Sequence, residues 1–227
     1  MRYFPVLLLL LLTASCGRPL TEAEVDFLKE IQGDTLDHSR VHLAPYSTVG
    51  SISRTYLTRP RTTCRELILP PSPKKSFTST TAGLVAFNQI FLNPDWYLED
   101  YLEGWPEELN LSAAMFLAHE LTHVWQWQHR KTTRYHPLKG AAEHLPAQDP
   151  YLFDPAAKPR FLDYPYEHQA SLVEEFVCCR ALDPEGARTQ RLESLVSQAM
   201  DPKPLSLSRV KRVLIPWEGA EIKGICS

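Results

Sequence analysis

Hydrophobic residues crowd two central segments of the chain in patterns that predict helices. Residues 112–129 contain no proline or glycine, and their apolar side chains fall on almost every face of the expected helix. Asn110 or Ser112 is available as its N-cap. A second helix is predicted to begin near Tyr166, in YEHQASLVEEFVCCRAL, and to end by Asp183. A helix that is apolar all round is buried, so the first of the two should lie at the centre of the domain.

The pattern predicts shorter elements on either side. In LTEAEVDFLKEIQGD, Thr21 and Glu24 stand three residues apart, as in a capping box, and a short helix should follow. The apolar run Leu84–Leu92, closed by Asn93 and Pro94, is the strongest predicted strand. These elements predict an α+β fold with a mainly helical core and a small sheet.

Two long stretches are predicted to be mainly loop. Between residues 41 and 76, prolines and basic residues interrupt the β-branched runs, which indicates exposed loop with one or two short strands. Residues 130–165 are rich in proline and aromatic residues, and loops of that length are usually functional or disordered. A further helix is expected over residues 185–200.

Composition indicates one domain and gives no sign of a polyanion partner. The chain has 227 residues, of which 44% are hydrophobic, and this is enough to bury a core of its own. We expect a single domain over residues 16–227. The formal net charge is -3, and no internal repeat recurs, so we expect no nucleic-acid partner.

The N-terminus, MRYFPVLLLLLLTASCGRPL, predicts export. Its apolar run, residues 6–12, is far shorter than the roughly 20 residues that span a bilayer, so residues 1–15 are interpreted as a signal peptide. LTASC is similar to a bacterial lipobox, which would make Cys16 a lipidated first residue. With Gly17 next, the lipid anchor predicts the cell envelope, at the periplasmic face of the outer membrane. Ordinary signal cleavage near Ser15 is the alternative.

Four further cysteines are disulfide candidates. Lipidation of Cys16 leaves an even number in a compartment that permits disulfides. Adjacent helical residues point about 100° apart, so the neighbouring pair should bond to different partners rather than to each other. We therefore expect Cys64 and Cys226 each to pair with one of Cys178 and Cys179. Buried free thiols are the alternative.

The segment AHELTHVWQ carries the candidate chemistry. His119 and His123 lie four apart on one helix face and can converge on one metal ion. Glu120 lies about 100° round the helix, placed to accept a proton from water without being a ligand. Zinc in catalytic sites takes three protein ligands and leaves a fourth position open, so one ligand is missing. The alternative is a core helix that happens to carry two imidazoles.

Two candidates compete for the third ligand position. His129 lies ten residues after His119, which is where metzincins place their third histidine ligand. That family has a glycine at the position of Gln126, so that the chain can turn back, and Gln126 therefore argues against His129. Glu167, on the second helix, is the preferred ligand. The small residues that follow it, Ala170 and Ser171, would let the two helices approach each other. Glu174 and Glu175 are the fallbacks, and Ser171 or Glu174 could accept a hydrogen bond from a ligand histidine.

AHELTHVWQWQ followed by YEHQASLVEEF resembles a group of bacterial zinc metallopeptidases that are gluzincin-like, carry an HE(L/M)THVWQ motif and are associated with Rhs proteins or secretion. The similarity covers residues 84–182. It implies a zincin-like fold in which His119, His123 and Glu167 bind the metal and Glu120 is the general base. His168 departs from the group, where glutamine is commoner.

Together these features predict a lipid-anchored, exported, zinc-dependent metallopeptidase that hydrolyses amide bonds in the bacterial envelope. We expect Zn²⁺ as cofactor, a peptide or protein substrate with peptidoglycan as a further candidate, and membrane contact through the lipid anchor. The alternative is a non-catalytic, peptidase-like envelope protein with structural zinc or a partner-binding role. The candidate donors for stabilising the oxyanion are Tyr164, Tyr166, His168, His144 and Arg160.

Overall fold

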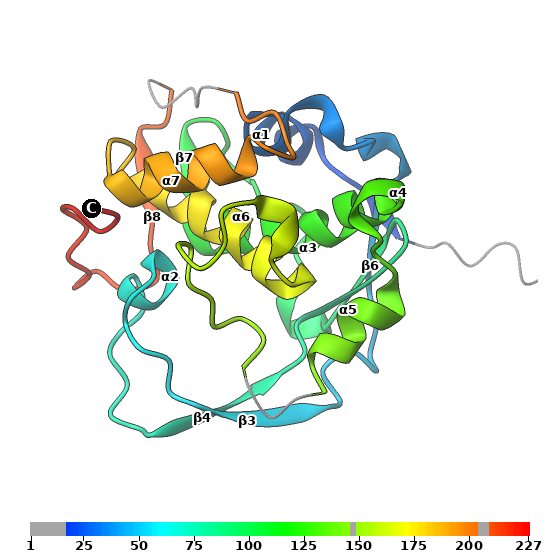
Figure 1. Ribbon diagram of the computed structural model, residues 1–227, viewed down its shortest axis with the longest axis horizontal. Coiled ribbons are helices and arrows are strands. Elements are labelled where there is room, and N and C mark those ends of the chain that lie inside the picture. The colour runs from blue at the N-terminus through cyan, green and yellow to red at the C-terminus, as the bar shows by residue number, and fades with distance from the viewer. Residues whose placement is uncertain (1–16, 146–148, 204–208) are drawn as a thin grey trace, which may run out of the picture.

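The computed structural model describes residues 17–145, 149–203 and 209–227 (Figure 1). Within these ranges the chain forms seven α-helices and three small sheets, which confirms the α+β class. The helices are α1 (Glu22–Gln32), α2 (Cys64–Leu67), α3 (Leu111–Gln128), α4 (Arg130–Thr133), α5 (Pro137–Glu143), α6 (Tyr166–Leu182) and α7 (Ala187–Val196). The strands are β1 (Arg18–Pro19), β2 (His42–Pro45), β3 (Ser53–Leu57), β4 (Ser76–Thr80), β5 (Gly83–Ala86), β6 (Gln89–Leu92), β7 (Glu108–Asn110) and β8 (Arg212–Leu214).

Helix α3 lies at the centre, as its all-round apolar pattern predicts. The side chain of Asn110 accepts a hydrogen bond from the Ala113 backbone N–H, which caps the helix. Buried side chains run from Leu111 to Gln126 on all faces. Helix α6 packs along α3, and α7 packs in turn on α6 (Figure 1). The predicted bounds of α3 and α6 are confirmed to within one or two residues.

The four-stranded sheet, in the order β1-β2-β6-β5, covers another side of α3, and its edge strand β5 contacts the helix. The prediction of one strand over Leu84–Leu92 is wrong. The chain reverses at Phe87 and Asn88, so that β5 and β6 pair as an antiparallel hairpin. Phe87 takes a φ of 64°, which a bulky residue seldom adopts, and so the apolar run gives no sign of the turn. The strand that contacts α3 is therefore the short edge strand β5, and not one continuous strand over residues 84–92.

The two stretches predicted as loop contain more structure than expected. Strands β3 and β4 form a separate antiparallel ribbon, and the segment between them carries the short helix α2. Residues 130–165 hold α4 and α5, so the prediction of one long loop is wrong there. Helix α5 begins with Pro137 at its first position, where a missing N–H has no cost, and the side chain of His136 caps it.

The N-terminal and C-terminal helices follow their predicted positions. Helix α1 has the expected capping box, with Thr21 accepting from the Glu24 N–H and Glu24 accepting from the Thr21 N–H. Helix α7 is shorter than the predicted 185–200. In the described ranges no helix is both long enough and apolar enough to cross a bilayer. The signal peptide predicted over residues 1–15 and the lipidation site at Cys16 lie outside the described residues.

Two disulfides join distant parts of the chain to α6. Cys178 is bonded to Cys64 at the start of α2, and its neighbour Cys179 is bonded to Cys226 near the C-terminus. All four bonded cysteines are fully buried. Because adjacent helical residues point in different directions, one short stretch of α6 holds two segments on separate sides.

Opening either disulfide should lower the free energy of unfolding strongly. The bonded residues are 114 and 47 positions apart, and for loops of these lengths the chain-entropy model gives roughly 4 to 5 kcal/mol apiece. Chemical denaturation of the Cys64→Ser/Cys178→Ser and Cys179→Ser/Cys226→Ser variants measures the loss. Thiol labelling of the unfolded, unreduced wild-type protein should find these four cysteines unreactive. Four reactive thiols, or variants as stable as wild type, would contradict the pairing.

Candidate metal centre

Two histidines of α3 and one glutamate of α6 meet in the interior. His119 and His123 are 7% and 6% exposed, and Glu167, in the first turn of α6, is 5% exposed. The Nε2 atoms of both histidines lie 3.4 Å from Oε2 of Glu167. One potential ligand atom from each residue lies within 4.8 Å of the others. The structure thus brings together the three side chains that the motif and the second helix suggested.

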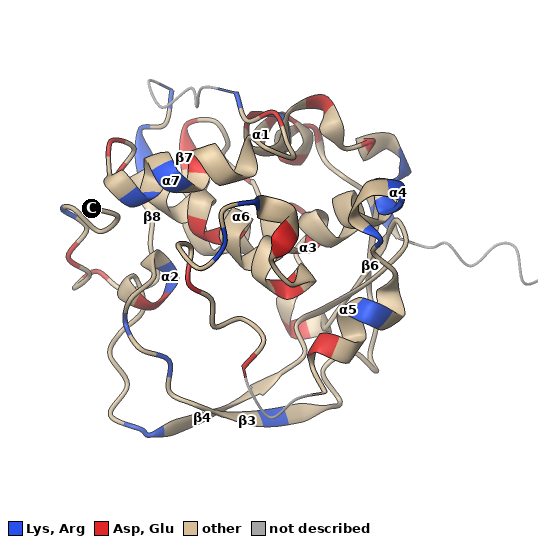
Figure 2. Ribbon diagram, in the orientation of Figure 1, with Lys and Arg blue, Asp and Glu red and all other residues tan. Residues whose placement is uncertain are grey.

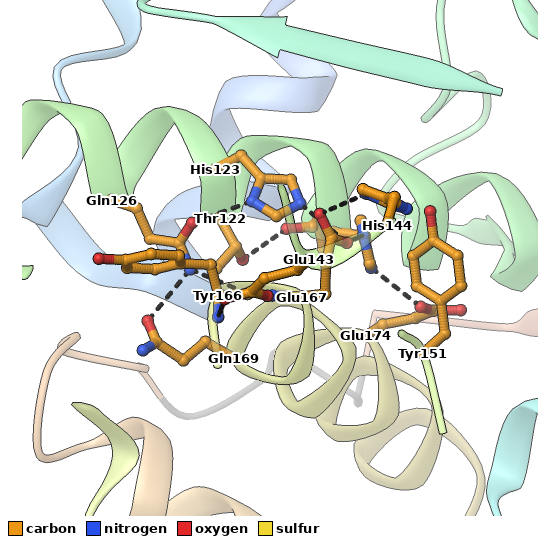
Figure 3. A network of polar contacts seen from close by, with 12 residues as sticks. Thr122, His123, Gln126, Glu143, His144, Tyr151, Tyr166, Glu167, Gln169 and Glu174 are labelled. Atoms are coloured by element: carbon orange, nitrogen blue, oxygen red, sulfur yellow. Dashed lines mark hydrogen bonds and ion pairs between the residues drawn. The ribbon is translucent and has the colours of Figure 1, made fainter. Parts of the chain in front are cut away.

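Each imidazole is oriented through its other ring nitrogen (Figure 3). His119 Nδ1 lies 3.2 Å from a carboxylate oxygen of Glu174, and His123 Nδ1 lies 2.9 Å from Oε1 of Gln126. Gln126 in turn donates to the Tyr166 carbonyl and to Gln169 on α6. Such contacts fix the ring orientation and tautomer of a ligand histidine. Gln126 therefore has a role that sequence analysis missed, since it was considered only as an obstacle to a turn.

Helix α5 and the residue after it hold the α6 end of the centre. Both carboxylate oxygens of Glu143 accept hydrogen bonds at 2.9 Å, one from the Tyr166 N–H and one from the Glu167 N–H. The first N–H groups of a helix have no acceptor within the helix, so Glu143 caps α6 from a different part of the chain. His144 Nε2 lies 3.0 Å from the second oxygen, Oε1, of Glu167. The stretch predicted as loop therefore positions the carboxylate that faces the histidines (Figure 3).

The charges of the centre depend on one another. Burial would lower the pKa of His119, but contacts with Glu167 and Glu174 outweigh it and raise that pKa to about 10. Burial would raise the pKa of Glu174, whereas Arg65 and His119 lower it to about 2. Burial also opposes ionisation of Glu167, yet His123 and His119 hold its pKa well below the usual range. Without a metal, the buried centre thus favours ionised carboxylates at Glu167 and Glu174 and protonated imidazoles. A metal cation that binds there would displace the imidazole protons.

Glu120 lies beside this group without belonging to it. It is 7% exposed and faces Gly83 at the start of the edge strand β5. A Cβ atom added at Gly83 would stand 2.6 Å from the Glu120 carboxylate carbon. The glycine therefore makes room for the carboxylate, and burial raises the pKa of Glu120. A carboxyl group with a raised pKa is suited to accepting a proton near neutrality.

Two cavities are lined by Glu120 and His119. The first has a volume of about 210 Å³ and reaches all three members of the His119, His123 and Glu167 group. Its walls include Ile52, Arg54, Tyr56, Ser79, Tyr135, His144 and Tyr151. The second, about 290 Å³, has an apolar wall made by Ile68, Leu69, Trp96, Met115 and Phe116. The two cavities share Gly83, His119, Glu120 and Tyr151, so water and a substrate can approach the centre through either of them.

The other candidate residues lie elsewhere or have other partners. His129 ends α3, with Nδ1 3.0 Å from the Trp125 carbonyl oxygen, and is not in the group. Glu175 faces away and accepts hydrogen bonds from the Cys64 N–H and from Arg188. Ser171 is buried without a hydrogen-bond partner for its hydroxyl among the described residues.

Of the five suggested oxyanion donors, only His144 lines the first cavity, where Tyr135 and Tyr151 also lie. Tyr164 bonds to loop backbone, and Arg160 pairs with Asp163. Tyr166 donates to the Thr133 carbonyl, and the ring of His168 packs near Phe153. Sequence analysis missed both cavity tyrosines, because no spacing along the chain connects them with α3.

The donor set suits a divalent cation. Two imidazoles and one carboxylate is an arrangement that zinc accepts, with a fourth direction left free. A second group of potential ligands, Cys64, Cys179 and Cys226, consists of cysteines that are already in disulfides. Among the described residues, His119, His123 and Glu167 therefore form the one group of potential metal ligands that is not held in disulfides.

Fold and centre together define a small α+β domain built on two packed helices, one bearing a His-Glu-x-x-His motif and the other a facing glutamate. No family model matches the chain. It is 24% identical over 163 residues to the type VI secretion system spike protein VgrG2b of Pseudomonas aeruginosa. That alignment covers 72% of this chain but 13% of the spike protein. Among solved structures it is similar to the effector domain of VgrG2b, with a TM-score of 0.52, 19% identity, and coverage of 82% of this chain and 86% of that one.

These similarities correct two expectations. The assignment to an Rhs-associated, gluzincin-like group of zinc metallopeptidases is wrong, because the similar proteins are a type VI spike protein and its effector domain, and neither is described as a gluzincin protease. The predicted function of a lipid-anchored envelope metallopeptidase, with its non-catalytic envelope alternative, is wrong for the same reason. The chain is similar to the effector domain of a type VI secretion system spike protein and shares its fold.

Removing the carboxylate that orients His119 should weaken metal binding without abolishing it. We expect Glu174→Gln to raise the dissociation constant for Zn²⁺ by roughly 10- to 100-fold, the range found when outer partners of ligand histidines are lost. Competition with a chromogenic chelator measures the constant. Glu66→Gln is the matched control, since Glu66 also pairs with Arg65 but touches neither histidine. Equal affinities for Glu174→Gln and wild type would contradict this role.

Proposed function

We propose that this chain is a zinc-dependent hydrolase of amide bonds that acts as an effector-type domain. The observation that carries the proposal is the buried group of His119, His123 and Glu167, with Glu120 beside it and a cavity leading to both. The shared fold with the VgrG2b effector domain supports the effector character. The helix pair also supports a zincin-like interpretation of the fold, in which a His-Glu-x-x-His helix packs on the helix that supplies the third ligand.

The residues of the centre have distinct chemical tasks. A zinc ion held by His119, His123 and Glu167 would polarise a substrate carbonyl and lower the pKa of bound water toward neutrality. Glu120, kept out of the ligand group by its place on α3, would accept the proton of the attacking water and return it to the leaving amine. The hydroxyl groups of Tyr135 and Tyr151, which line the cavity, are candidates to donate to the oxyanion.

Amide hydrolysis and the two adjoining cavities indicate the class of substrate. A peptide or protein chain can occupy both cavities at once, since they meet at His119, Glu120, Gly83 and Tyr151. Peptidoglycan cross-bridges, which are also amides, are a further candidate substrate. The envelope location and the membrane contact remain predictions that depend on residues 1–16, outside the described ranges.

Loss of the base and loss of a ligand should have different effects. Glu120→Gln should reduce hydrolysis by at least 100-fold and leave zinc content and fold unchanged, because a positioned base contributes about 10²- to 10⁴-fold. His119→Ala and Glu167→Ala should lose zinc as well as activity. Zinc is measured by elemental analysis, and hydrolysis by mass spectrometry of new termini in a proteome-derived peptide mixture.

His129→Ala is the control, since it removes a nearby histidine of α3's end that does not face the centre. It should keep both zinc and activity. The proposal fails if the wild-type protein binds no zinc, or if Glu120→Gln hydrolyses peptides as fast as wild type does.

Gly83→Ala tests the space that Glu120 occupies. The added methyl group would stand 2.6 Å from the Glu120 carboxylate, which must therefore move, and its three nearest atoms all belong to Glu120. We expect zinc content to stay at the wild-type level and kcat to fall by roughly 10-fold or more, because small displacements of catalytic groups cost rate. Phe87→Ala, at an exposed position of the turn that follows the same strand and outside both cavities, is the control. An unchanged kcat in Gly83→Ala would show that Glu120 is not the base.

A further inference from the structure

The ribbon of β3 and β4 presents one face to the catalytic cavity. Side chains alternate along a strand, so Arg54 and Tyr56 share a face, and both line the first cavity together with Ile52, which directly precedes β3. Ser79, which pairs with Arg54 across the ribbon, lies on the same wall. The inner face of the ribbon therefore lines the same cavity as the metal ligands.

Arg54 is a cation on this wall that the protein itself does not neutralise. Its side chain is partly buried, and no described residue forms a hydrogen bond, ion pair or ring contact with its guanidinium group. The three segments outside the described ranges contain neither Asp nor Glu, so they can supply no carboxylate. The strands of the ribbon carry no acidic position either (Figure 2).

The other arginines near the centre have acidic partners. Arg59 pairs with Asp149, and Arg65 pairs with Glu66 and Glu174. The two glutamates that share the cavity with Arg54 have other contacts, since three histidines contact Glu167 and Gly83 accommodates Glu120. The planar fork of a guanidinium matches a carboxylate, with which it can form two parallel, charge-assisted hydrogen bonds. A substrate that enters this cavity can therefore supply the counter-charge.

We infer that Arg54 binds a carboxylate of the substrate and makes the enzyme select peptides with an acidic group close to the scissile bond, on the side that occupies the first cavity. The inference rests on the proposed function. The carboxylate can belong to an Asp or Glu side chain or to the C-terminus of a short peptide. In either case the apolar wall of the second cavity would receive the residues on the other side of the bond.

Cleavage-site profiling tests the selection. Wild-type protein is incubated with a proteome-derived peptide mixture, and the residues around each new terminus are identified by mass spectrometry. We expect Asp and Glu to be enriched at one position on one side of the cut. The same peptides made with Asn and Gln there should show kcat/KM values roughly 5- to 10-fold lower, as expected for loss of a partly buried charged pair. Enrichment only at peptide C-termini would assign the carboxylate to the terminus.

Variants of the ribbon separate recognition from a general effect. Arg54→Gln should lower the ratio of kcat/KM for acidic peptides to kcat/KM for their neutral counterparts to about 1, and Arg54→Glu should reverse the preference toward Lys and Arg. Lys75→Gln is the matched control, because it removes an exposed cation next to β4 that does not line the cavity. If Arg54→Gln slows acidic and neutral peptides equally, Arg54 acts on a group common to all substrates and the inference is wrong.

Failure of the inference differs from failure of the proposed function. Cleavage without acidic preference overturns the role of Arg54 and leaves the hydrolase proposal standing. If no peptide is cut, fluorescence anisotropy of labelled acidic peptides and their amide counterparts, with zinc-loaded Glu120→Gln protein, still measures selection. Equal binding of the two peptide sets by that protein would overturn the inference on its own.

Discussion

The structure depends on a buried polar centre between α3 and α6. Two imidazoles and two carboxylates lie in the interior of a helix pair, where a polar group without a partner costs free energy. Each of them has contacts on more than one side, through Gln126, His144, Arg65 and one another. The packing of α3 on α6 and the geometry of the site are therefore coupled, because the two helices cannot shift relative to each other without separating charged partners.

Helix α6 supports this centre on one side and the covalent framework on another. Its first turn presents Glu167, its middle presents Glu174, and the next turn carries the two disulfide cysteines. Glu175, between these functions, accepts the Cys64 N–H and an Arg188 hydrogen bond, so the bonded α2 segment is also held by a buried carboxylate. Arg65, one residue after Cys64, reaches back to Glu174. The disulfide thereby places a cation against the carboxylate that orients His119.

The part of the fold predictable from sequence is the part whose signals are local. Periodicity and capping placed α1, α3 and α6, since Thr21, Asn110 and the apolar faces act within a few residues. The β5–β6 turn was missed because Phe87 takes a positive φ that its residue type disfavours. At the centre, the i, i+4 histidines were predictable from spacing. The contact of His123 with Gln126, three residues on in the same helix, was also within reach of spacing, although sequence analysis missed it. The contact of His144 with Glu167, and the cavity wall formed by Tyr151 and Arg54, depend on tertiary packing and had no local signal.

The same distinction explains why the chemistry and the biological setting must be inferred from different parts of the chain. A motif of five residues constrains only what lies within one or two helical turns, namely two ligand directions and the place of Glu120. Proteins that share such short segments can differ in everything beyond them, and the resemblance based on AHELTHVWQWQ and YEHQASLVEEF suggested the wrong group. The β3–β4 ribbon, the second cavity and the residues around Tyr151 come from distant segments. Selection of a substrate requires contacts at a distance from the reacting bond, so it must be encoded in those segments rather than in the motif.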